Sequence, residues 1–167
     1  DMMDYGDRIL NTARDLFFKY GLRNVTMDDI CHELGISKKT LYQTYENKKD
    51  IVNTITTKFL VSHEEEYEVI ISESKDAVDE LLKLMENLNY IFERLNPRMI
   101  FDMQRYFPEA WQTFSKHKSN FMLSKITCNL KKGIKEGLFR RDLNVDIIAI
   151  MRLQQTQIAL DPMVFPP

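Results

Sequence analysis

The chain has 167 residues, 44% hydrophobic and 29% charged, which is enough length and apolar content to bury a core. Its formal net charge of -2 gives no global sign of nucleic-acid binding, so any basic site must be local. The first residues lack a signal-peptide pattern, and no apolar run approaches the ~18 residues of a membrane span. Two cysteines are too few for a disulfide framework and fit a reducing cytosol, so we expect a cytoplasmic protein away from membranes.

Helical periodicity predicts an all-α fold, in which five glycines and five prolines punctuate the chain. Apolar residues at helical spacing predict a first helix from about Ile9 to Tyr20, and Gly21 is placed to end it. Thr26 can cap a short second helix, which Gly35 then stops. These two helices form the start of the chain's first predicted domain.

The segment GISKKTLYQTY at residues 35–45 predicts a third helix after a very short connection. Ser37 can cap this helix, while Ile36 and Leu41 have the spacing of a hydrophobic staple. Only residues 35–37 separate it from the second helix. Two short helices joined by a three-residue turn with glycine describe a helix-turn-helix.

Five further helices are predicted after the helix-turn-helix. Asn47 can cap a long fourth helix from Lys48 to about Ser72, although its β-branched start also resembles a strand. Prolines at positions 97 and 108 divide the fifth, sixth and seventh helices. The seventh is long and closes near position 137, with Gly133 as a point of possible distortion. An eighth runs from Asn144 to about residue 160, and we expect domains at 1–50 and 51–167.

Lysines gather at the starts of the third and fourth predicted helices. Residues 35–49 contain Lys38, Lys39, Lys48 and Lys49 against one acidic residue, Glu46. A cation at a helix N-terminus is unfavourable by ~0.3–1 kcal/mol, so local helix stability does not explain the lysines. An external phosphate would explain them, because helix N-termini present free N–H groups. Four solvated surface lysines are the alternative interpretation.

The third helix carries hydrogen-bonding groups on the face opposite the inward Leu41. Gln43 has the amide that reads adenine, and the tyrosines Tyr42 and Tyr45 suit packing on sugar while donating to phosphate. Ordinary half-buried packing is the alternative for both tyrosines. In a helix-turn-helix the second helix enters the major groove of DNA, which matches this polar face.

Residues Arg8–Val52 resemble the DNA-binding domain of the TetR family of transcriptional regulators. The resemblance lies in the Tyr-Gly stop of the first helix, T-x-x-D-I at Thr26, G-I-S-K-x-T-L-Y at Gly35, and an aromatic residue and a lysine at the next helix start. It implies an all-α homodimer with a three-helix DNA-binding domain, joined through a long fourth helix to a C-terminal helical bundle that binds a small ligand. A repressor that binds double-stranded DNA at a palindromic operator is then expected.

Carried over by position, the resemblance assigns DNA contacts to one set of residues: Thr26, Ser37, Lys38, Lys39, Thr40, Tyr42, Gln43, Tyr45 and Lys48. Two of them depart from the family pattern. Lys39 stands where a small residue, often glycine, is common, so the base-reading surface is expected to differ. Tyr45 stands where phenylalanine is common, which adds a hydroxyl contact or nothing.

Methionines and aromatic residues beyond the DNA-binding part suggest an adaptable pocket for a small, largely apolar ligand. The candidates are His63, Tyr67, Met85, Phe92, Met99, Met103, Trp111, Phe114 and Met122. Core packing is the alternative for the apolar members, and a surface position for His63 and Tyr67. No cofactor or metal is expected, because no ligand set with metal-binding spacing occurs.

Members of this family usually dimerise through two long C-terminal helices, whereas this sequence predicts one before its last residues. We therefore expect the C-terminal domain to lack its last helix, and dimerisation through a reduced interface is the alternative. The interface candidates are Ile147, Ile148, Met151 and Ile158, and core packing is their alternative role.

Catalysis is not expected from this sequence. The run His63–Tyr67 resembles the metalloprotease motif H-E-x-x-H, but a tyrosine replaces the second histidine. No glycine-rich phosphate loop is present, and Cys128 has no evident catalytic partner in the sequence. A helical protein–protein adaptor with a non-DNA-binding helix-turn-helix is the alternative to a regulator.

Overall fold

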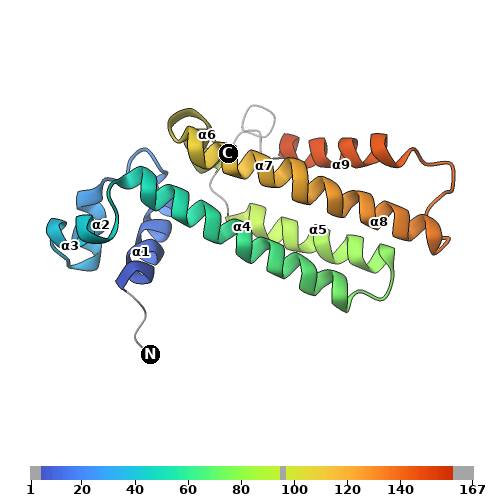
Figure 1. Ribbon diagram of the computed structural model, residues 1–167, viewed down its shortest axis with the longest axis horizontal. Coiled ribbons are helices and arrows are strands. Elements are labelled where there is room, and N and C mark those ends of the chain that lie inside the picture. The colour runs from blue at the N-terminus through green and yellow to red at the C-terminus, as the bar shows by residue number, and fades with distance from the viewer. Residues whose placement is uncertain (1–4, 95–96, 160–167) are drawn as a thin grey trace. The chain divides into compact units, whose positions relative to one another are not determined.

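The computed structural model describes the backbone of residues 5–94 and 97–159, and their side chains except at 92–94, 97, 157 and 159. All regular structure in this part of the chain is helical, as the sequence predicts (Figure 1). The chain divides into two compact units, each built from segments that are far apart in the sequence. Unit 1 comprises residues 1–59 and 95–113, and unit 2 comprises residues 60–94 and 114–167.

Unit 1 holds the predicted helix-turn-helix. Its helices are α1 (Tyr5–Tyr20), α2 (Met27–Leu34), α3 (Lys38–Thr44), the start of α4 (Lys48–Glu73), α6 (Pro97–Tyr106) and the start of α7 (Pro108–His117). Ile9, Phe17, Ile30, Leu41 and Ile51 are at most 1% exposed and form its centre. The periodic apolar positions of four helices therefore meet in one core. The β-branched start of α4 is helical, because Ile51 and Val52 pack into that core.

Caps and one glycine set the geometry of the helix-turn-helix. Thr26 and Asp29 form a reciprocal capping box at the start of α2, with the Thr26 Oγ1 accepting from the Asp29 amide at 3.1 Å. Gly35 ends α2 with φ of 69°, a left-handed conformation that glycine adopts without strain. Ser37 then caps α3 by accepting from the Thr40 amide at 3.1 Å. These contacts confirm the predicted boundaries of both helices.

Helix α6 packs within unit 1 through a buried carboxylate, which local sequence patterns did not predict. Asp102 is 3% exposed and accepts a hydrogen bond from the Arg23 amide at 2.9 Å. Arg23 lies in the α1–α2 connection, two residues after Gly21, whose φ is 84°. The carboxylate thus holds that connection against α6. The division into functional domains at residues 1–50 and 51–167 remains a prediction.

Unit 2 is a helical bundle. It consists of the rest of α4, α5 (Ala77–Arg94), the end of α7, the π-helical turn η1 (Lys118–Met122), α8 (Leu123–Lys135) and α9 (Val145–Ala159). Ile126, Leu130, Ala149 and Leu153 form a buried cluster between α8 and α9. Helices α7 and α8 and the turn η1 keep helical backbone angles at their junctions and make up the predicted seventh helix. The expected ends at Asn96 and Leu160 lie outside the described residues.

The distortion in the long helix lies at η1, whereas the sequence suggested Gly133. Gly133 is a regular α8 residue, and a Cβ added there would lie 2.1 Å from Cδ2 of Phe139. The glycine is therefore required for close packing of the Phe139 ring against the helix. Its helix-weakening effect is offset because the ring covers the backbone.

A buried polar network links α5 to α8 in unit 2. Glu80 is 3% exposed, and its carboxylate accepts from Nζ of Lys132 at 2.8 Å and from Nδ2 of Asn129 at 2.9 Å. The same Asn129 amide donates to the carbonyl of Ala77 at 3.0 Å. Because both oxygens of Glu80 have partners, its buried charge is compensated within the bundle.

Candidate nucleic-acid interface and cavity

Helix α3 presents a polar face because its single buried side chain seats it on unit 1. Leu41 is 0% exposed, and Ile36 before the cap is half-buried, which matches the predicted hydrophobic staple. The opposite side chains are exposed: Lys38, Lys39, Tyr42, Gln43 and Thr44. Tyr42 is 49% exposed, so its ring is not part of the core. This face can donate to phosphates and to base edges along one helix.

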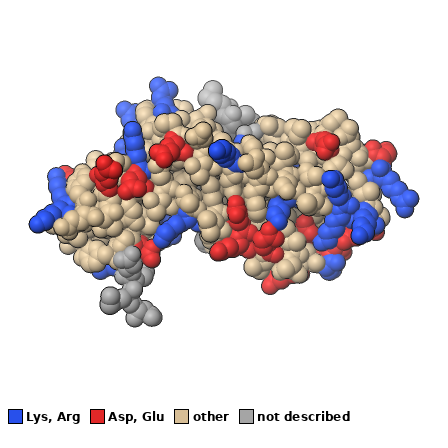
Figure 2. Space-filling model, viewed as in Figure 1, with Lys and Arg blue, Asp and Glu red and all other residues tan. Residues whose placement is uncertain are grey.

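The two lysines at the start of α3 differ in their partners. Lys38 pairs with Asp28 of α2 at 2.7 Å, and this hydrogen bond raises the pKa of the Lys38 ammonium. Lys39 is exposed and has no partner within the described part of the chain. In Figure 2 basic side chains project at the α3 end of unit 1, with acidic side chains beside them. Lys39 is therefore the more available cation at the start of α3.

Three predicted hydroxyl contacts already serve the helix caps. The Ser37 hydroxyl accepts from the Thr40 amide and lies 2.8 Å from the Thr40 hydroxyl. The Thr26 hydroxyl both accepts from the Asp29 amide and donates to the Asp29 carboxylate, which lowers the pKa of that carboxyl. These hydroxyls fix where α2 and α3 begin, and so fix the direction in which the free N–H groups of each first turn point.

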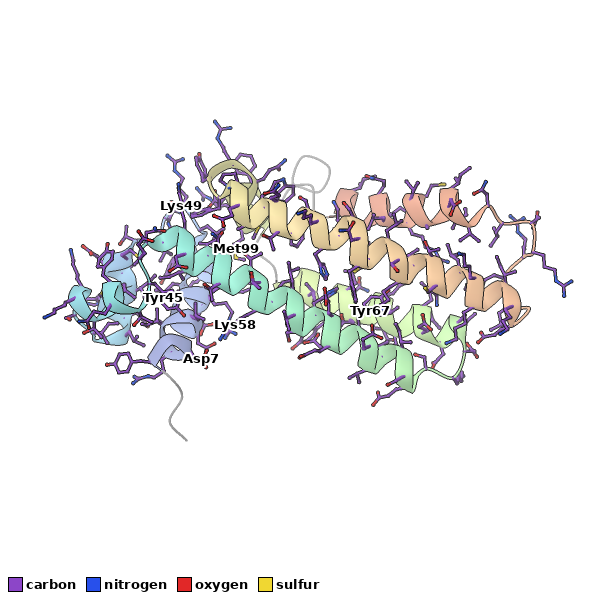
Figure 3. The ribbon with its side chains drawn as sticks, viewed as in Figure 1. Asp7, Tyr45, Lys49, Lys58, Tyr67 and Met99 are labelled. Carbon is purple, nitrogen blue, oxygen red and sulfur yellow. The ribbon has the colours of Figure 1, made fainter. Side chains whose placement is uncertain are left out.

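The structure favours the packing interpretation for Tyr45. This residue is the C-cap of α3, and its side chain is half-buried between α3 and α1 (Figure 3). Its hydroxyl donates to the carbonyl of Gly6 at 3.4 Å. The extra oxygen relative to phenylalanine thus links α3 to α1, and the contact of Tyr45 with DNA stays a prediction.

Lys48 lies at the start of α4 in a more enclosed site than the sequence suggested. Its Nζ donates to the carbonyl of Arg23 at 3.4 Å and lies 5.9 Å and 5.6 Å from the ring centroids of Phe17 and Phe107. Burial lowers the pKa of the Lys48 ammonium, against the opposing effect of Asp102. Lys48 therefore packs unit 1 together as well as standing at a helix N-terminus.

Unit 2 contains a cavity of about 360 Å³. Its lining comes from α4, α5, the turn η1, α8 and α9: His63, Tyr67, Leu81, Leu84, Met85, Asn87, Leu88, Asn89, Met122, Ile126, Asn129, Arg152, Gln155 and Thr156. The volume lies within the ~300–1,000 Å³ range of small-molecule sites. Figure 3 labels Tyr67 on the α4 segment of this unit.

Four of the nine predicted pocket residues line this cavity, namely His63, Tyr67, Met85 and Met122. Met99 and Met103 are instead buried in unit 1 on α6, and Trp111 also belongs to unit 1. Phe114 belongs to unit 2 but is not part of the lining, and the side chain of Phe92 lies outside the described part. Met99 and Met103 therefore pack in the core of unit 1, which was the alternative to lining a pocket.

The sequence analysis named His63 and Tyr67 among the polar lining residues but did not identify Asn129 and Arg152. Asn129 is 3% exposed, and its Oδ1 accepts from Nη1 of Arg152 at 3.4 Å. A polar residue on the apolar stripe of an amphipathic helix was the available signal, since Asn129 falls between Ile126 and Leu130.

An aromatic cluster packs around His63, which lines the cavity from α4. The rings of His63 and His117 lie 5.5 Å apart, and His117 stacks on Phe121 with centroids 5.0 Å apart. Nδ1 of His117 lies 3.0 Å from a carboxylate oxygen of Glu64. Burial, and then the nearby His117, lower the pKa of His63, so His63 lines the cavity as a neutral ring at pH 7.

Helix α9 has one apolar face without a covering element in the described structure. Ile147, Met151 and Ile158 are 55%, 53% and 48% exposed, and Ile150, not among the candidates, is 52% exposed. Ile148 is partly buried and packs against the core cluster of unit 2, as the alternative of core packing expects, and its place at an interface stays a prediction. The exposed face is thus one stripe along α9.

Two further features concern membranes and metals. No helix in the described ranges is both long and apolar enough to span a bilayer. Within the same ranges, no three side chains of His, Cys, Asp or Glu are grouped so that they could hold a metal ion.

Comparison with known proteins agrees with this architecture. Residues 9–55 match the family model described as bacterial regulatory proteins, tetR family. The uncharacterized HTH-type transcriptional regulator YvaF of Bacillus subtilis is 26% identical over 82% of this chain and 72% of its own length. The HTH-type transcriptional repressor KstR2 of Mycobacterium tuberculosis is 25% identical over 84% of this chain and 72% of its own length.

Solved structures share the fold. The ketosteroid regulator KstR2 of M. tuberculosis superposes with a TM-score of 0.69 at 22% identity, over 96% of this chain and 83% of its own. The regulator FadR of B. subtilis, in complex with stearoyl-CoA, gives a TM-score of 0.67 at 17% identity, over 94% of this chain and 86% of its own. The helix-turn-helix geometry, the match of residues 9–55 and these relatives agree: residues 9–55 form a DNA-binding domain of the tetR type, and the curated relatives are HTH-type transcriptional regulators.

Proposed function

We propose that this protein is a homodimeric repressor that binds a palindromic operator and leaves it when a small molecule enters the cavity of unit 2. The observation that carries the DNA-binding part is the exposed face of α3, where Lys39, Tyr42 and Gln43 point away from the side sealed by Leu41. A recognition helix seated in this way enters the major groove with its N-terminal end first.

A second copy of the chain is the proposed cover for the apolar face of α9. Exposed isoleucine and methionine side chains at 147, 150, 151 and 158 recur on one face of the helix. A two-fold dimer would carry two α3 helices into successive major grooves, roughly 34–36 Å apart. The operator would then be a palindrome with half-sites one helical turn apart.

Selection of DNA from a random pool tests the DNA-binding proposal. We expect enrichment of a palindrome whose half-sites are read by the dimer. A pool from which no palindrome is enriched would reject the repressor and favour the adaptor, because an adaptor has no operator.

The release mechanism that we propose is a population shift carried by α4. This helix runs from Lys48 in unit 1 to Glu73 in unit 2, and His63 and Tyr67 on it line the cavity. A ligand that favours one orientation of α4 would change the spacing of the two recognition helices. Spin labels on exposed positions of unit 1 measure this spacing. An unchanged distance on ligand-induced release would exclude the swing of α4.

The proposed role is regulation rather than catalysis. FadR of B. subtilis was solved in complex with stearoyl-CoA, which shows that a relative with this fold accommodates a ligand with an apolar chain. The same kind of response in this chain would use the cavity of unit 2. A gel-shift titration with candidate ligands on the selected operator measures the response directly.

A further inference from the structure

The cavity of unit 2 has one lining side chain with a formal charge at pH 7 in the described structure, and that side chain is Arg152. The rest of the lining is apolar or neutral, since burial keeps His63 uncharged. A guanidinium stays protonated at all ordinary pH values and carries five N–H donors in a planar fork. The described lining of the cavity therefore carries one positive charge, on the guanidinium of Arg152.

Arg152 lacks an acidic partner among the described residues. Its Nη1 donates to Oδ1 of Asn129 at the long distance of 3.4 Å, and its guanidinium carbon lies 5.8 Å from the ring centroid of Phe139. Burial lowers the pKa of Arg152, which indicates that its charge has lost part of its hydration. A half-buried guanidinium with one weak hydrogen bond leaves most of its donors available.

The carboxylate of the α5–α8 network does not supply a counter-charge for Arg152. Glu80 has one oxygen bound by Lys132 at 2.8 Å and the other by Asn129 at 2.9 Å. Glu80 and Lys132 therefore neutralise each other. Asn129 bridges this pair to Arg152, and it orients the guanidinium without cancelling its charge.

We infer that the cavity takes a small amphipathic monoanion, an apolar body with one carboxylate that pairs with Arg152. This inference rests on the proposed function, in which the cavity holds the releasing ligand. A carboxylate matches the fork of a single arginine through two parallel hydrogen bonds. A phosphate monoester carries about -1.5 to -2 charges, which one guanidinium does not balance.

Other lining groups fit the two ends of such a molecule. Burial raises the pKa of the Tyr67 phenol, so it stays protonated as a possible donor, and Thr156 on α9 adds a hydroxyl. Leu81, Leu84 and Leu88 on α5 offer an apolar wall. The volume of about 360 Å³ is near the lower end for small-molecule sites, which favours a compact body.

Titration calorimetry with probes of equal chain length tests the inference without DNA. Decanoate is compared with neutral 1-decanol, with cationic decylamine and with decyl phosphate. We expect decanoate to bind most tightly to the full chain. Equal or tighter binding of the alcohol or the amine, tighter binding of the phosphate, or no binding of decanoate would overturn the inference.

Three variants locate the charge. Arg152→Met keeps the apolar stem and should weaken decanoate binding roughly 10- to 100-fold, the range expected when a hydrogen bond to a charged group is lost. Arg152→Lys keeps the charge but loses the fork, so its affinity should be intermediate. Arg141→Met removes an exposed arginine from the same unit and should change nothing. Unchanged binding by a folded Arg152→Met variant would also overturn the inference.

A gel shift with the selected operator separates this inference from the proposed function. If decanoate binds in an Arg152-dependent way but leaves the operator complex intact, the ligand class stands and the release mechanism fails. If decanoate does not bind but another small molecule releases the operator, the release mechanism stands and the monoanion is excluded.

Discussion

Lys39 is an exposed cation at the start of the recognition helix, with no partner in the described structure. We expect Lys39→Ala to flatten the plot of log affinity against log salt by roughly one unit per protomer, because one phosphate contact is lost. Binding isotherms across a salt series measure this slope. Lys131→Ala removes an exposed lysine from unit 2 and is the matched control. Equal slopes for both variants would place Lys39 away from the phosphates.

Lys48 differs from Lys39 because its ammonium already binds within unit 1. Its contacts with the Arg23 carbonyl and the Phe17 ring predict that Lys48→Ala lowers the thermal midpoint of unit 1 as well as the affinity for every DNA sequence. Thermal melting and the salt series separate the two effects. A lower midpoint with an unchanged salt slope would leave Lys48 as a packing residue and remove it from the phosphate contacts.

His63 makes the stability of unit 2 depend on pH. Burial and His117 lower its pKa in the folded state, outweighing the opposite effects of Glu66 and Glu64. Below the unfolded value near 6.5, the unfolded chain takes up a proton that the folded chain resists, so stability falls as pH falls. Urea midpoints between pH 7.5 and 5.5 should therefore decline less in His63→Gln than in the wild type. His32→Gln, at an exposed histidine in unit 1, is the control and should keep the wild-type decline.

At the scale of one element, replacing Gly133 in α8 with alanine has two opposite effects on the stability of unit 2. An alanine would favour the helix by roughly 1 kcal/mol, but its Cβ would lie 2.1 Å from a carbon of the Phe139 ring. Overpacking of this kind costs about 1–3 kcal/mol, so we expect Gly133→Ala to destabilise unit 2. Urea unfolding measures the change. Adding Phe139→Leu should restore part of the loss, and strictly additive effects would argue against the contact.

Asp102 makes α6 part of unit 1. Replacing it with alanine removes the acceptor of the Arg23 amide, and we expect a loss of roughly 1 kcal/mol in the free energy of unfolding of unit 1, because this hydrogen bond is part-buried. Asp102→Asn keeps an acceptor oxygen and should cost less. Hydrogen exchange of the Arg23 amide reports the contact directly. Equal protection of this amide in the wild type and the alanine variant would show that the carboxylate does not hold the connection.

Local patterns predicted the helices because caps, stops and apolar periods act within a few residues. Thr26, Gly35 and Ser37 each have the cap role expected from sequence. Contacts between distant elements were not predictable in this way. Met99 and Met103 share the composition of a pocket lining, yet α6 packs in unit 1 and buries them there. Tyr45 was ambiguous because a tyrosine at the end of α3 can face DNA or α1, and its contact with the Gly6 carbonyl depends on how the two helices pack.

At the scale of the whole molecule, α4 contributes residues to both the DNA-binding unit and the unit that holds the cavity. A ligand in the cavity can therefore change the affinity for DNA only through helices that contribute to both units, such as α4. The polar residues at the cavity also come together only through contacts between distant parts of the sequence. Arg152 on α9, Asn129 on α8 and Glu80 on α5 are far apart in the sequence, and their alignment depends on how three helices pack. No spacing rule within one helix predicts that arrangement.

Under the proposed function, operator binding by the whole molecule depends on dimerisation through α9. Ile147→Glu together with Met151→Glu places two charges on the exposed apolar face, where burial against a second copy would be costly. We expect this variant to sediment as a monomer at concentrations where the wild type is a dimer. Its affinity for a single half-site should remain, because α3 is untouched.

Affinity for the palindrome should fall steeply in the same variant, since two linked half-sites gain from effective concentration and an unlinked monomer does not. Val69→Glu is the control, because it adds a charge at an exposed apolar position on α4 of the same unit. A double-glutamate variant that remained a dimer would place the interface elsewhere on the chain. A wild type that was itself a monomer yet bound the palindrome tightly would show that two copies pair only on DNA.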